Sequence, residues 1–403
     1  MLNIKTFLFF AFVILIGQFS IAQLKDYSFG EGLSYTAKDS TFGIKASFRF
    51  QNQFSGRWNV NNDDLRDIGN LSSNFLIRRS RIKFDGFAYS PKLTYKIELG
   101  VSNRDLDHDG AQYFGDGGNM ILDAFLKWNF YKGFSVKTGQ FKLSGNRERI
   151  ISSADMQFVD RSILNTNFTL DRGIGASLHY DKTLGEKFGL HLTAVLSKGE
   201  GRNVIASNIG GFQTTLKAEI MPFGEFKNKG AYVGGAIVKE QKPKLAVAVA
   251  YDQNNGVIRA RGNKGSFFPE NTELKNLSTV FADFMFKYKG LSVMGEYVIR
   301  KTNDNDPQIS DVDGNQLGRY YFTGQSFNIQ AGYMFDNNYE FSARYTYLEP
   351  QNFSIAPVTN NYTLAVSKYI IEHSLKVQTD IGYYENQFAD DGLTWRVQIE
   401  IGF

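Results

Sequence analysis

Three basic side chains recur at every second position of one short segment. The stretch "FLIRRSRIKFDGF" carries Arg79, Arg81 and Lys83 with this spacing. In an extended strand, alternate side chains point to the same face, and each such step advances about 6–7 Å. If this face borders water, Arg79, Arg81 and Lys83 would form a row of positive charges, a cationic ladder, that attracts anions. Asp85 continues the same face, so the alternative is a wall network in which carboxylates neutralise the ladder.

Two lysines in the following segments share this predicted face. Lys96 lies in "PKLTYKIELGVS" and Lys127 in "DAFLKWNF", each at a polar position between apolar ones. We therefore assign both to the anion-attracting surface. The neutralising alternative again applies, because three carboxylates are expected on the same face: Glu98, Asp123 and Glu219.

The segment 144–171 combines charges of both signs without strand alternation. Its stretch "NRERIISSADMQFVDRS" contains five candidate site residues: Arg147, Glu148, Arg149, Asp160 and Arg161. Opposed charges across a narrow aqueous passage would create a transverse field and select solutes by size and charge. We predict that this segment constricts a pore. The alternative is a loop that projects outward and carries a short amphipathic helix.

A second charged segment has the spacing of a calcium loop. In "RDLDHDGAQYFGD" the acids Asp105, Asp107 and Asp109 alternate, Gly110 follows, and Asp116 stands at the twelfth position. Oxygen ligands at alternate positions can wrap a Ca²⁺ ion. The twelfth ligand is usually the longer Glu, and no flanking helices are expected, so a solvated acidic loop is the favoured alternative. Apart from this possible Ca²⁺, the sequence predicts no cofactor.

Nucleophilic catalysis has little support in the sequence. The chain has no cysteine and only four histidines: His108, His179, His191 and His373. A serine hydrolase needs a serine aligned with a histidine, and none of the four stands in a recognisable motif with one. We predict that the protein is not an enzyme.

The elements that position these residues are strands of period two. The last residues, "TWRVQIEIGF", alternate between apolar and polar side chains, and this pattern recurs along the chain. We count about sixteen such segments, each near ten residues long. They lie near 41–55, 74–89, 92–102, 119–130, 134–143, 172–181, 187–198, 211–221, 244–252, 277–288, 291–300, 321–335, 339–348, 361–370, 373–384 and 393–403.

This pattern predicts an all-β fold, a transmembrane antiparallel barrel of about sixteen strands. Ten tilted residues cross the apolar core of a bilayer, and aromatic residues gather at the segment ends. Connections alternate between long and short, as in outer-membrane barrels with long extracellular loops and short periplasmic turns. The connection 222–243 is an exception, because it is long where the alternation predicts a short periplasmic turn. Backbone groups must be paired in lipid, so the sheet has to close. The alternative is a soluble sandwich or barrel with its apolar faces inward.

One cation does not fit the predicted lumen. Arg78 has the opposite parity to Arg79 and Arg81, so simple alternation places it on the outer face. Near the headgroups a lipid-facing cation costs little, and we expect Arg78 there.

The N-terminus predicts export. "MLNIKTFLFFAFVILIGQFSIAQ" has one cation, an apolar core and small residues before Gln23, as secretory signal peptides do. We divide the chain into a signal peptide at 1–22, a periplasmic lead-in at 23–40 and a barrel at 41–403. Removing the signal peptide lowers the net charge from +4 to +3, which gives no indication of nucleic-acid binding.

Three stretches resemble the phosphate-selective porin O and P family, in its Bacteroidetes-type form. They are the basic strand Arg78-Arg79-Ser80-Arg81, the "DAFL" stretch from Asp123, and "GQFK" at 139–142 followed by "RER" at 147–149. The resemblance is clearest over residues 30–180. It implies a sixteen-stranded trimeric porin that passes small anions, phosphate among them, across the outer membrane of a Gram-negative bacterium.

The resemblance also implies partners. Such a barrel contacts the lipid bilayer and lipopolysaccharide, and its C-terminal aromatic, here Phe403, is presented to the outer-membrane assembly machinery. No nucleic acid is expected. The alternative function is a barrel without an open pore, serving as an adhesin or scaffold or as a lipid-cleaving enzyme.

Overall fold

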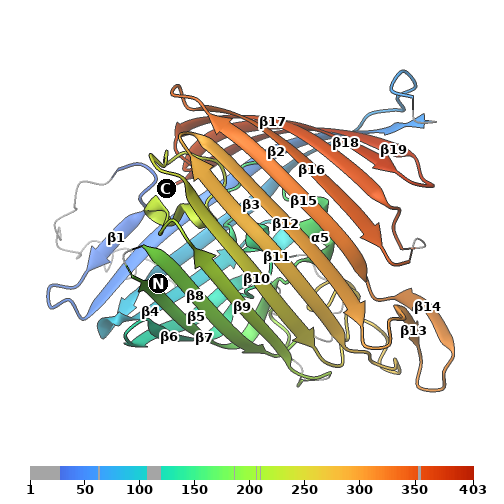
Figure 1. Cartoon of the computed structure of the whole chain (residues 1–403), viewed down its shortest axis with the longest axis horizontal. Helices are drawn as coiled ribbons and strands as arrows, with labels where there is room; N and C mark the ends of the chain where they lie inside the picture. Colours follow the sequence, from blue (N-terminus) through green and yellow to red (C-terminus); the bar gives the residue numbers. More distant parts are fainter. Residues whose placement is uncertain are drawn as a thin grey trace, which may run out of the picture.

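Sixteen strands of the computed structural model form one closed antiparallel barrel (Figure 1). The structure describes residues 28–61, 64–106, 119–185, 187–205, 207–208, 210–352 and 355–403. Within these residues, all sixteen predicted segments are strands of the barrel, so the predicted fold class is confirmed. The predicted signal peptide lies outside the described residues. The lead-in contains one short strand, β1 (Leu33–Thr36), which pairs with β2.

The barrel strands follow one another around the wall in chain order. Their bounds are β2 (Phe42–Val60), β3 (Ser72–Ala88), β4 (Ser90–Gly100), β5 (Ile121–Tyr131), β6 (Phe134–Lys142), β7 (Arg172–Leu184), β8 (Phe188–Ser197), β9 (Gln213–Met221), β10 (Lys244–Asn254), β11 (Leu277–Tyr288), β12 (Leu291–Thr302), β15 (Gly324–Met334), β16 (Tyr339–Pro350), β17 (Thr359–Ile371), β18 (Leu375–Asn386) and β19 (Asp391–Gly402). Within the described residues, the connections contain a separate hairpin and four short helical segments: β13 (Gln308–Ser310), β14 (Gln316–Tyr320), α2 (Asn103–Leu106), α4 (Arg147–Ile150), α5 (Ile163–Phe168) and η2 (Lys227–Tyr232).

The first and last barrel strands close the sheet. β19 pairs with β2 from Asp391 opposite Val60 to Gly402 opposite Arg49. Beyond this ladder, the backbone of Phe403 exchanges two hydrogen bonds with Phe48, at 2.7 and 2.9 Å, and the two rings stack. The C-terminal aromatic therefore completes the seam, and neither strand leaves an open edge along the paired length.

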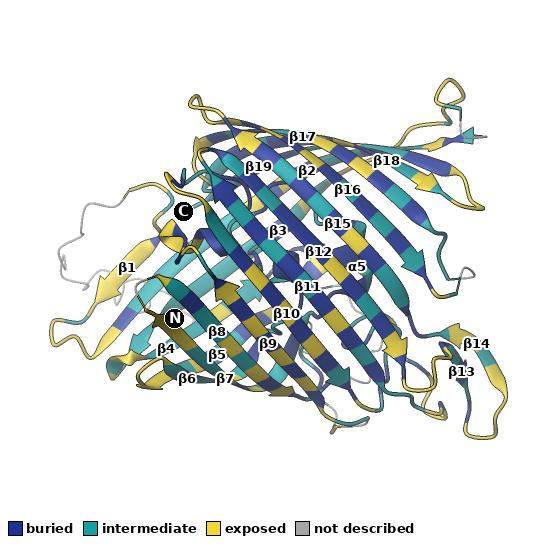
Figure 2. Cartoon of the chain, in the orientation of Figure 1, coloured by how far each residue is buried: buried dark blue, intermediate teal, exposed yellow. Residues whose placement is uncertain are grey.

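The burial pattern is the reverse of that in a soluble protein. Along β9, Lys217 is 7% exposed and Glu219 is 2% exposed, whereas Leu216 is 50% exposed. The same inversion holds at the C-terminus, where Ile399 is 53% exposed and Glu400 is fully buried. Figure 2 shows this as stripes of exposed and buried residues across the wall. Because the apolar side chains point away from the interior, the soluble alternative is excluded.

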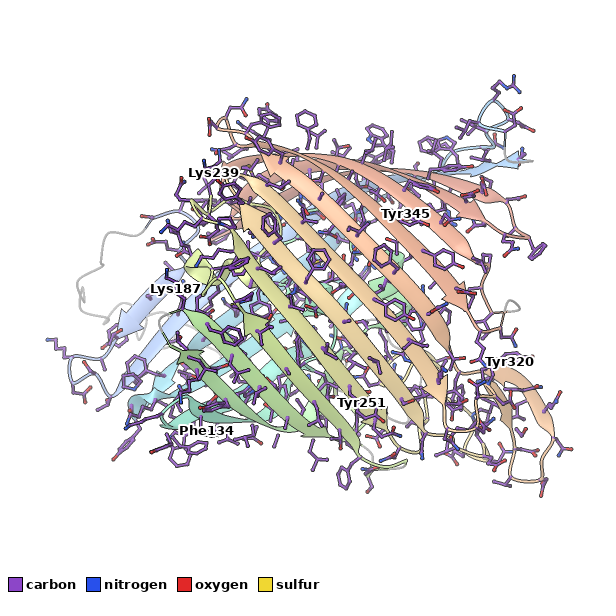
Figure 3. The ribbon with its side chains drawn as sticks, viewed as in Figure 1. Phe134, Lys187, Lys239, Tyr251, Tyr320 and Tyr345 are labelled. Carbon is purple, nitrogen blue, oxygen red and sulfur yellow. The ribbon has the colours of Figure 1, made fainter. Side chains whose placement is uncertain are left out.

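Aromatic side chains stand on the outer surface. Figure 3 shows Tyr251 and Tyr345 on the outside of the wall and Phe134 at its lower edge. Phe134 packs against Tyr180 with ring centroids 4.5 Å apart. Such rings suit the boundary between lipid tails and headgroups, because one end is apolar and the other polar. Among the described residues, no helix is long and apolar enough to span a bilayer.

Two connections fold into the barrel and pack against each other there. The first is the segment 143–171, which joins β6 to β7 and carries α4 and α5. The second is 222–243, which joins β9 to β10 and carries η2. The two meet where the amide of Gly234 donates to the carbonyl of Asp155 at 2.6 Å. The long exception among the short turns is thus a second inserted segment.

The inserted segments cover an apolar surface inside the barrel. Leu164 and Phe168 of the first segment belong to one buried cluster with Phe281 of β11 and Val298 of β12. Ile151 belongs to another cluster that includes apolar residues of the second segment and of β10 to β12: Phe226, Ala231, Ala246, Met285 and Met294. Burial of these side chains against the wall holds both segments in place.

β10 is shaped to accept these segments. Its inward side chains are Ala246, Ala248 and Ala250, all at most 1% exposed, while Val249 faces outward and is 53% exposed. An alanine side chain ends at Cβ, so the inserted backbone can approach the wall closely. The stretch "LAVAVAY" therefore gives β10 an apolar outer face and an inner face of small side chains, which leaves space for the inserted segments.

Candidate functional site

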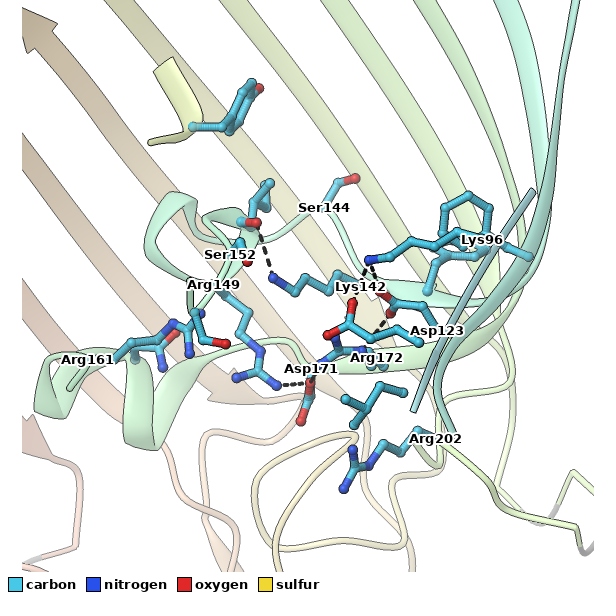
Figure 4. A pocket seen from close by; sticks show the side chains of 18 of the residues that line it. Lys96, Asp123, Lys142, Ser144, Arg149, Ser152, Arg161, Asp171, Arg172 and Arg202 are labelled. Atoms are coloured by element: carbon cyan, nitrogen blue, oxygen red, sulfur yellow. Dashed lines mark hydrogen bonds and ion pairs between the residues drawn. The ribbon is translucent and has the colours of Figure 1, made fainter. Parts of the chain in front are cut away.

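One side of the barrel interior remains hollow and charged. A cavity of about 700 Å³ runs along β3 to β9, and Figure 4 shows part of its lining. Thirteen Lys and Arg side chains line it: Arg78, Arg79, Arg81, Lys96, Arg104, Lys137, Lys142, Arg149, Arg161, Arg172, Arg202, Lys217 and Lys264. Seven carboxylates accompany them: Glu98, Asp105, Asp123, Asp160, Asp171, Asp181 and Glu219. The lining formed by the described residues therefore carries six more basic than acidic side chains.

A β-bulge brings two consecutive arginines to this cavity. In the β2–β3 ladder, Gln51 pairs with Arg79 and Asn52 pairs with Ile77, so Arg78 is the extra residue. A bulge resets the alternation of side chains by one position. Ile77 is accordingly 56% exposed on the outer face, while Arg78 and Arg79 both line the cavity. Our prediction that Arg78 points outward is wrong, because parity holds only in an unbroken ladder.

The two arginines share one carboxylate from the inserted segment. Arg78 Nη2 donates to both carboxylate oxygens of Asp160 at 2.9 Å, and Arg79 Nη2 reaches Oδ1 at 3.4 Å. Arg79 also donates to Gln51 Oε1 at 2.7 Å. Burial would raise the pKa of the Asp160 carboxyl, but the two guanidiniums outweigh burial and hold it well below its usual value. Asp160 is therefore an anion at neutral pH.

The rest of the predicted ladder is paired. Arg81 contacts Asp105 at 3.0 Å, and Lys83 contacts Asp85 at 3.0 Å. Both the ladder and the proposed neutralising network are thus present in part, and the cations outnumber the acids in the cavity lining. Lys83 is not among the cavity-lining residues.

The two other predicted lysines lie in different surroundings. Lys96 lines the cavity and bridges Glu98 at 2.7 Å and Asp123 at 2.6 Å. Lys127 is half-buried on β5 and faces Lys137 of β6 across the ladder. Of this pair, only Lys137 lines the cavity.

A group of cations surrounds the start and end of the first inserted segment. Arg149 forms an ion pair with Asp171, which lies within 3.8 Å of Arg172 as well. Lys142 donates to the backbone carbonyls of Ile150 and Ile151, at 3.2 and 3.3 Å. Arg172 also donates to Asp123 at 2.6 Å, so two acids, Asp123 and Asp171, lie among these positive groups (Figure 4).

Two further cations of this group come from loops. Arg161 donates to the carbonyl of Glu148 at 2.9 Å and to that of Ile151 at 2.8 Å. Burial, followed by repulsion from Arg149, lowers the pKa of Arg161 to about 9. Burial likewise lowers the pKa of Lys264 to about 8, against the opposing attraction of Asp171.

Arg147 and Glu148 lie away from the cavity, between the inserted segments and the wall. The Arg147 guanidinium is fully buried and contacts Glu219 at 2.5 Å, Asp283 at 2.7 Å and the carbonyl of Ala231 at 3.0 Å. It therefore joins both inserted segments to β9 and β11. Glu148 accepts from the amide and hydroxyl of Ser162 at 2.9 and 2.5 Å. We expected both side chains to face the pore; instead they anchor the segment that borders it.

The predicted calcium loop is described only at its first ligand. Asp105 is 8% exposed, pairs with Arg81 and accepts from Ser102 Oγ at 2.6 Å. The other predicted ligands, Asp107, Asp109 and Asp116, lie outside the described residues. In the part of the chain that the structure describes, no group of three or more His, Asp or Glu side chains could hold a metal ion. The Ca²⁺ site stays a prediction.

Two of the described histidines, His179 and His191, contact neighbouring polar groups, whereas His108 lies outside the described residues. His179 lines the cavity between Ser177 Oγ, at 2.8 Å, and Thr193 Oγ1, at 3.2 Å. A threonine thus occupies the place that a carboxylate holds in a hydrolase triad. His191 lies between Asp181 at 2.8 Å and Glu225 at 2.7 Å, and so joins the second inserted segment to the wall.

Several cavity residues were missed at the level of sequence. Lys137 has inward parity in a predicted strand and could have been found by extending the alternation along it. Lys142 and Arg172 pair with each other at one end of the β6–β7 ladder and have the opposite parity, so alternation does not predict that they line the cavity. Lys264 and Arg202 lie in irregular loops, where no periodicity gives a direction. Only the tertiary fold brings these two to the cavity.

A closed barrel with an apolar exterior and a charged, hollow interior is typical of the diffusion channels of the outer membrane. The chain matches the family model of the phosphate-selective porin O and P family over residues 44–389. It belongs to this family, and it is an outer-membrane porin of the Gram-negative type. The family assignment indicates a channel rather than an enzyme.

Solved porins share the fold at low sequence identity. One is a loop-deletion form of OmpT from Vibrio cholerae, at 10% identity and a TM-score of 0.55, covering 90% of this chain and all of that one. Another is an anion-selective porin from Comamonas acidovorans, at 10% identity and a TM-score of 0.52, covering 90% of this chain and all of that one. A third is Salmonella typhi OmpF in complex with daunomycin, at 11% and 0.55, covering 92% of this chain and all of that one. A comparison with curated proteins found no match.

Proposed function

We propose that this porin passes small hydrophilic anions, phosphate among them, in preference to cations. The observation that carries the proposal is the charge of the cavity, whose lining has thirteen basic and seven acidic side chains. Inside a narrow channel with low-dielectric walls, a net positive lining raises the local concentration of anions and lowers that of cations. Membership of the phosphate-selective porin O and P family agrees with this solute class.

The segment 143–171 is proposed as the constriction. It crosses the interior, is held by Arg147 on one side, and presents Arg149, Asp160 and Arg161 to the cavity on the other. Solutes would pass between this segment and the wall formed by β3 to β9. Charges of both signs border this passage, so it would select by charge distribution as well as by size.

Reversal potentials in planar bilayers test the anion preference. With a tenfold KCl gradient across a bilayer holding the purified full-length porin, we expect a potential whose sign shows chloride crossing faster than potassium. Addition of potassium phosphate at pH 7 is expected to reduce the chloride current, since both anions would use the same path. A cation-selective reversal potential would overturn the proposal. Closed barrels, with or without lipase activity, would favour the scaffold or enzyme alternatives.

Several cellular features are also proposed. Residues 1–22 would be removed as a signal peptide, and 23–40 would lie in the periplasm. The outer aromatic and apolar belt would contact lipid and lipopolysaccharide, Phe403 would be recognised during assembly, and three copies would form a homotrimer. Mass spectrometry of the mature chain tests the cleavage before Gln23. Cross-linking in outer membranes tests the trimer, and deletion of Phe403 tests the assembly signal through the yield of folded barrel.

A further inference from the structure

We infer that Phe125 and the lysine pair Lys127 and Lys137 form a subsite on the inner wall that binds carboxylates carrying an aromatic ring. The inference rests on the anion preference proposed above. It adds a solute class to that preference, namely organic anions with an apolar body. All three residues lie on the wall strands β5 and β6.

The first step is a pair of like charges. Lys127 of β5 and Lys137 of β6 stand directly opposite each other in the antiparallel ladder. Like charges in this position repel each other and destabilise a sheet. Among the described residues, no carboxylate oxygen lies within 4 Å of either ammonium group, whereas Lys96 on the neighbouring strand β4 contacts two acids. The pair therefore lacks a direct counter-ion, and an anion in the lumen would supply one.

The second step is an aromatic ring on the inner wall. Phe125 shares the inward parity of Lys127, lines the cavity and is only partly buried. The residue opposite Phe125 in the β5–β6 ladder is Gly139, which has no side chain to cover the ring. Contact between an apolar ring and water is unfavourable, so a solute that covers the ring is favoured.

The third step is the contact between charge and ring. The Lys137 ammonium lies 5.4 Å from the ring centroid of Phe125 and 4.1 Å from that of Phe141, and the two rings meet edge to face at 6.4 Å. A cation over an aromatic face is attracted by the ring quadrupole. This attraction keeps the ammonium beside Phe125, so a carboxylate that reaches Lys137 brings its own ring close to that of Phe125.

The solute class follows from these contacts. A carboxylate accepts charge-assisted hydrogen bonds from ammonium groups, and the lysine pair offers two of them. An aromatic ring attached to the carboxylate gains a stacked or edge-to-face contact with Phe125. Chloride, phosphate and acetate gain only from the charge. The subsite therefore favours an aromatic carboxylate, such as benzoate, over these smaller anions.

The experiment measures how benzoate and, separately, acetate inhibit the chloride current at pH 7 through the full-length porin in planar bilayers. Both are singly charged carboxylates, so the ring is the difference between them. In the wild type we expect half-inhibition by benzoate at a concentration about fivefold lower than by acetate, because the ring contact adds to the charge. In F125L this ratio is expected to fall to about twofold or less, with half-inhibition by acetate unchanged.

The lysine is tested by charge removal. In K137Q both anions should need a concentration about threefold higher for half-inhibition, because the carboxylate loses one ammonium partner. K83Q is the matched control for charge, since Lys83 pairs with Asp85 and does not line the cavity, and it should change neither value. F341L is the matched control for the ring. Phe341 is 56% exposed on the outer face of β16, so the ratio of benzoate to acetate should stay that of the wild type.

The outcomes separate this inference from the proposed function. Equal half-inhibition by benzoate and acetate in the wild type would overturn the subsite, and so would a ratio that F125L leaves unchanged. Unchanged values for both anions in K137Q would overturn the role of the lysine pair. The reversal potential is read from the same membranes, and a cation preference there would overturn the proposed function itself. If F125L forms no channels, F125M provides the same test, with a heat-dependent gel shift as the measure of barrel folding.

Discussion

The two sides of the barrel interior differ in almost every property, although the outer wall is the same around them. Along β3 to β9 the interior is a hollow lined with charges. Along β10 to β19 it is filled by the two inserted segments, with apolar clusters and buried polar contacts. Gln157 shows the second kind of contact: its amide donates to Ser292 at 2.9 Å and to Glu340 at 2.7 Å.

The difference shows that inward-facing positions of a barrel have two distinct uses. On the hollow side, charged residues meet water and can act on a solute. On the filled side, charged residues such as Lys376, which is fully buried and donates to the carbonyl of Ala154 at 2.7 Å, hold the inserted backbone. Apolar and polar residues alternate in the same way in the strands on both sides of the interior. The role of an inward-facing charged residue therefore depends on whether an inserted segment packs against it.

The largest effect is expected at the joint between the two sides. Replacing Arg147 by Met would leave Glu219 and Asp283 buried without their main partner, which typically costs about 3–5 kcal/mol. We expect a lower midpoint of urea unfolding and a several-fold larger single-channel conductance, because both inserted segments lose their shared anchor. R66M is the control, since Arg66 pairs with Asp64 on the exposed surface and should change neither quantity. An unchanged conductance in R147M would show that the segments are held elsewhere.

A bulky residue placed on each side should give opposite results. A248F inserts a ring beneath the packed segments, where overpacking costs about 1–3 kcal/mol, so unfolding should occur at lower urea. S144F places the same ring in the cavity lining, where it should reduce conductance and leave the unfolding midpoint nearly unchanged. If both variants affected only stability, or both only conductance, the division of the interior would be wrong.

The hollow side should respond to pH in the alkaline range. Lys264 has its pKa lowered by burial to about 8, so it is mainly charged at pH 7 and mainly neutral at pH 9. The cavity loses the positive charge of Lys264 over this interval and part of that of Arg161, whose pKa is lowered to about 9, so the chloride-to-potassium permeability ratio should fall as pH rises. K264M should have the lower ratio at pH 7 and a smaller change between pH 7 and 9. A ratio that rises with pH in the wild type would contradict this assignment.

The smallest effect is expected at Lys83, at the end of the predicted ladder. Its pair with Asp85 has about a third of each side chain exposed, and pairs of this kind contribute about 0–1 kcal/mol. Because Lys83 does not line the cavity, K83Q should leave the phosphate inhibition and the permeability ratio close to those of the wild type. A large loss of anion preference in K83Q would extend the functional surface beyond the cavity described above.

The wall could be predicted from the sequence because period-two alternation is a local property. The polarity of residues such as Leu216 and Lys217 indicates whether each side chain faces lipid or the barrel interior. All sixteen strands could therefore be predicted from the alternation. The candidate site was predictable only in part. Arg79 and Arg81 follow the same local rule, but Arg78 does not, since the bulge that redirects it depends on its pairing with β2.

The amino-acid sequence by itself determined the closed wall, its apolar outer face and the positive excess of its charges, because each depends on residue type at a fixed spacing. Only the tertiary structure decided which inward charges meet water. That outcome depends on where the irregular segments 143–171 and 222–243 fold, and on contacts between residues far apart in the chain, such as Arg147 with Asp283 and Asp160 with Arg78. Irregular backbone has no period, so its direction is fixed by the surfaces on which it packs.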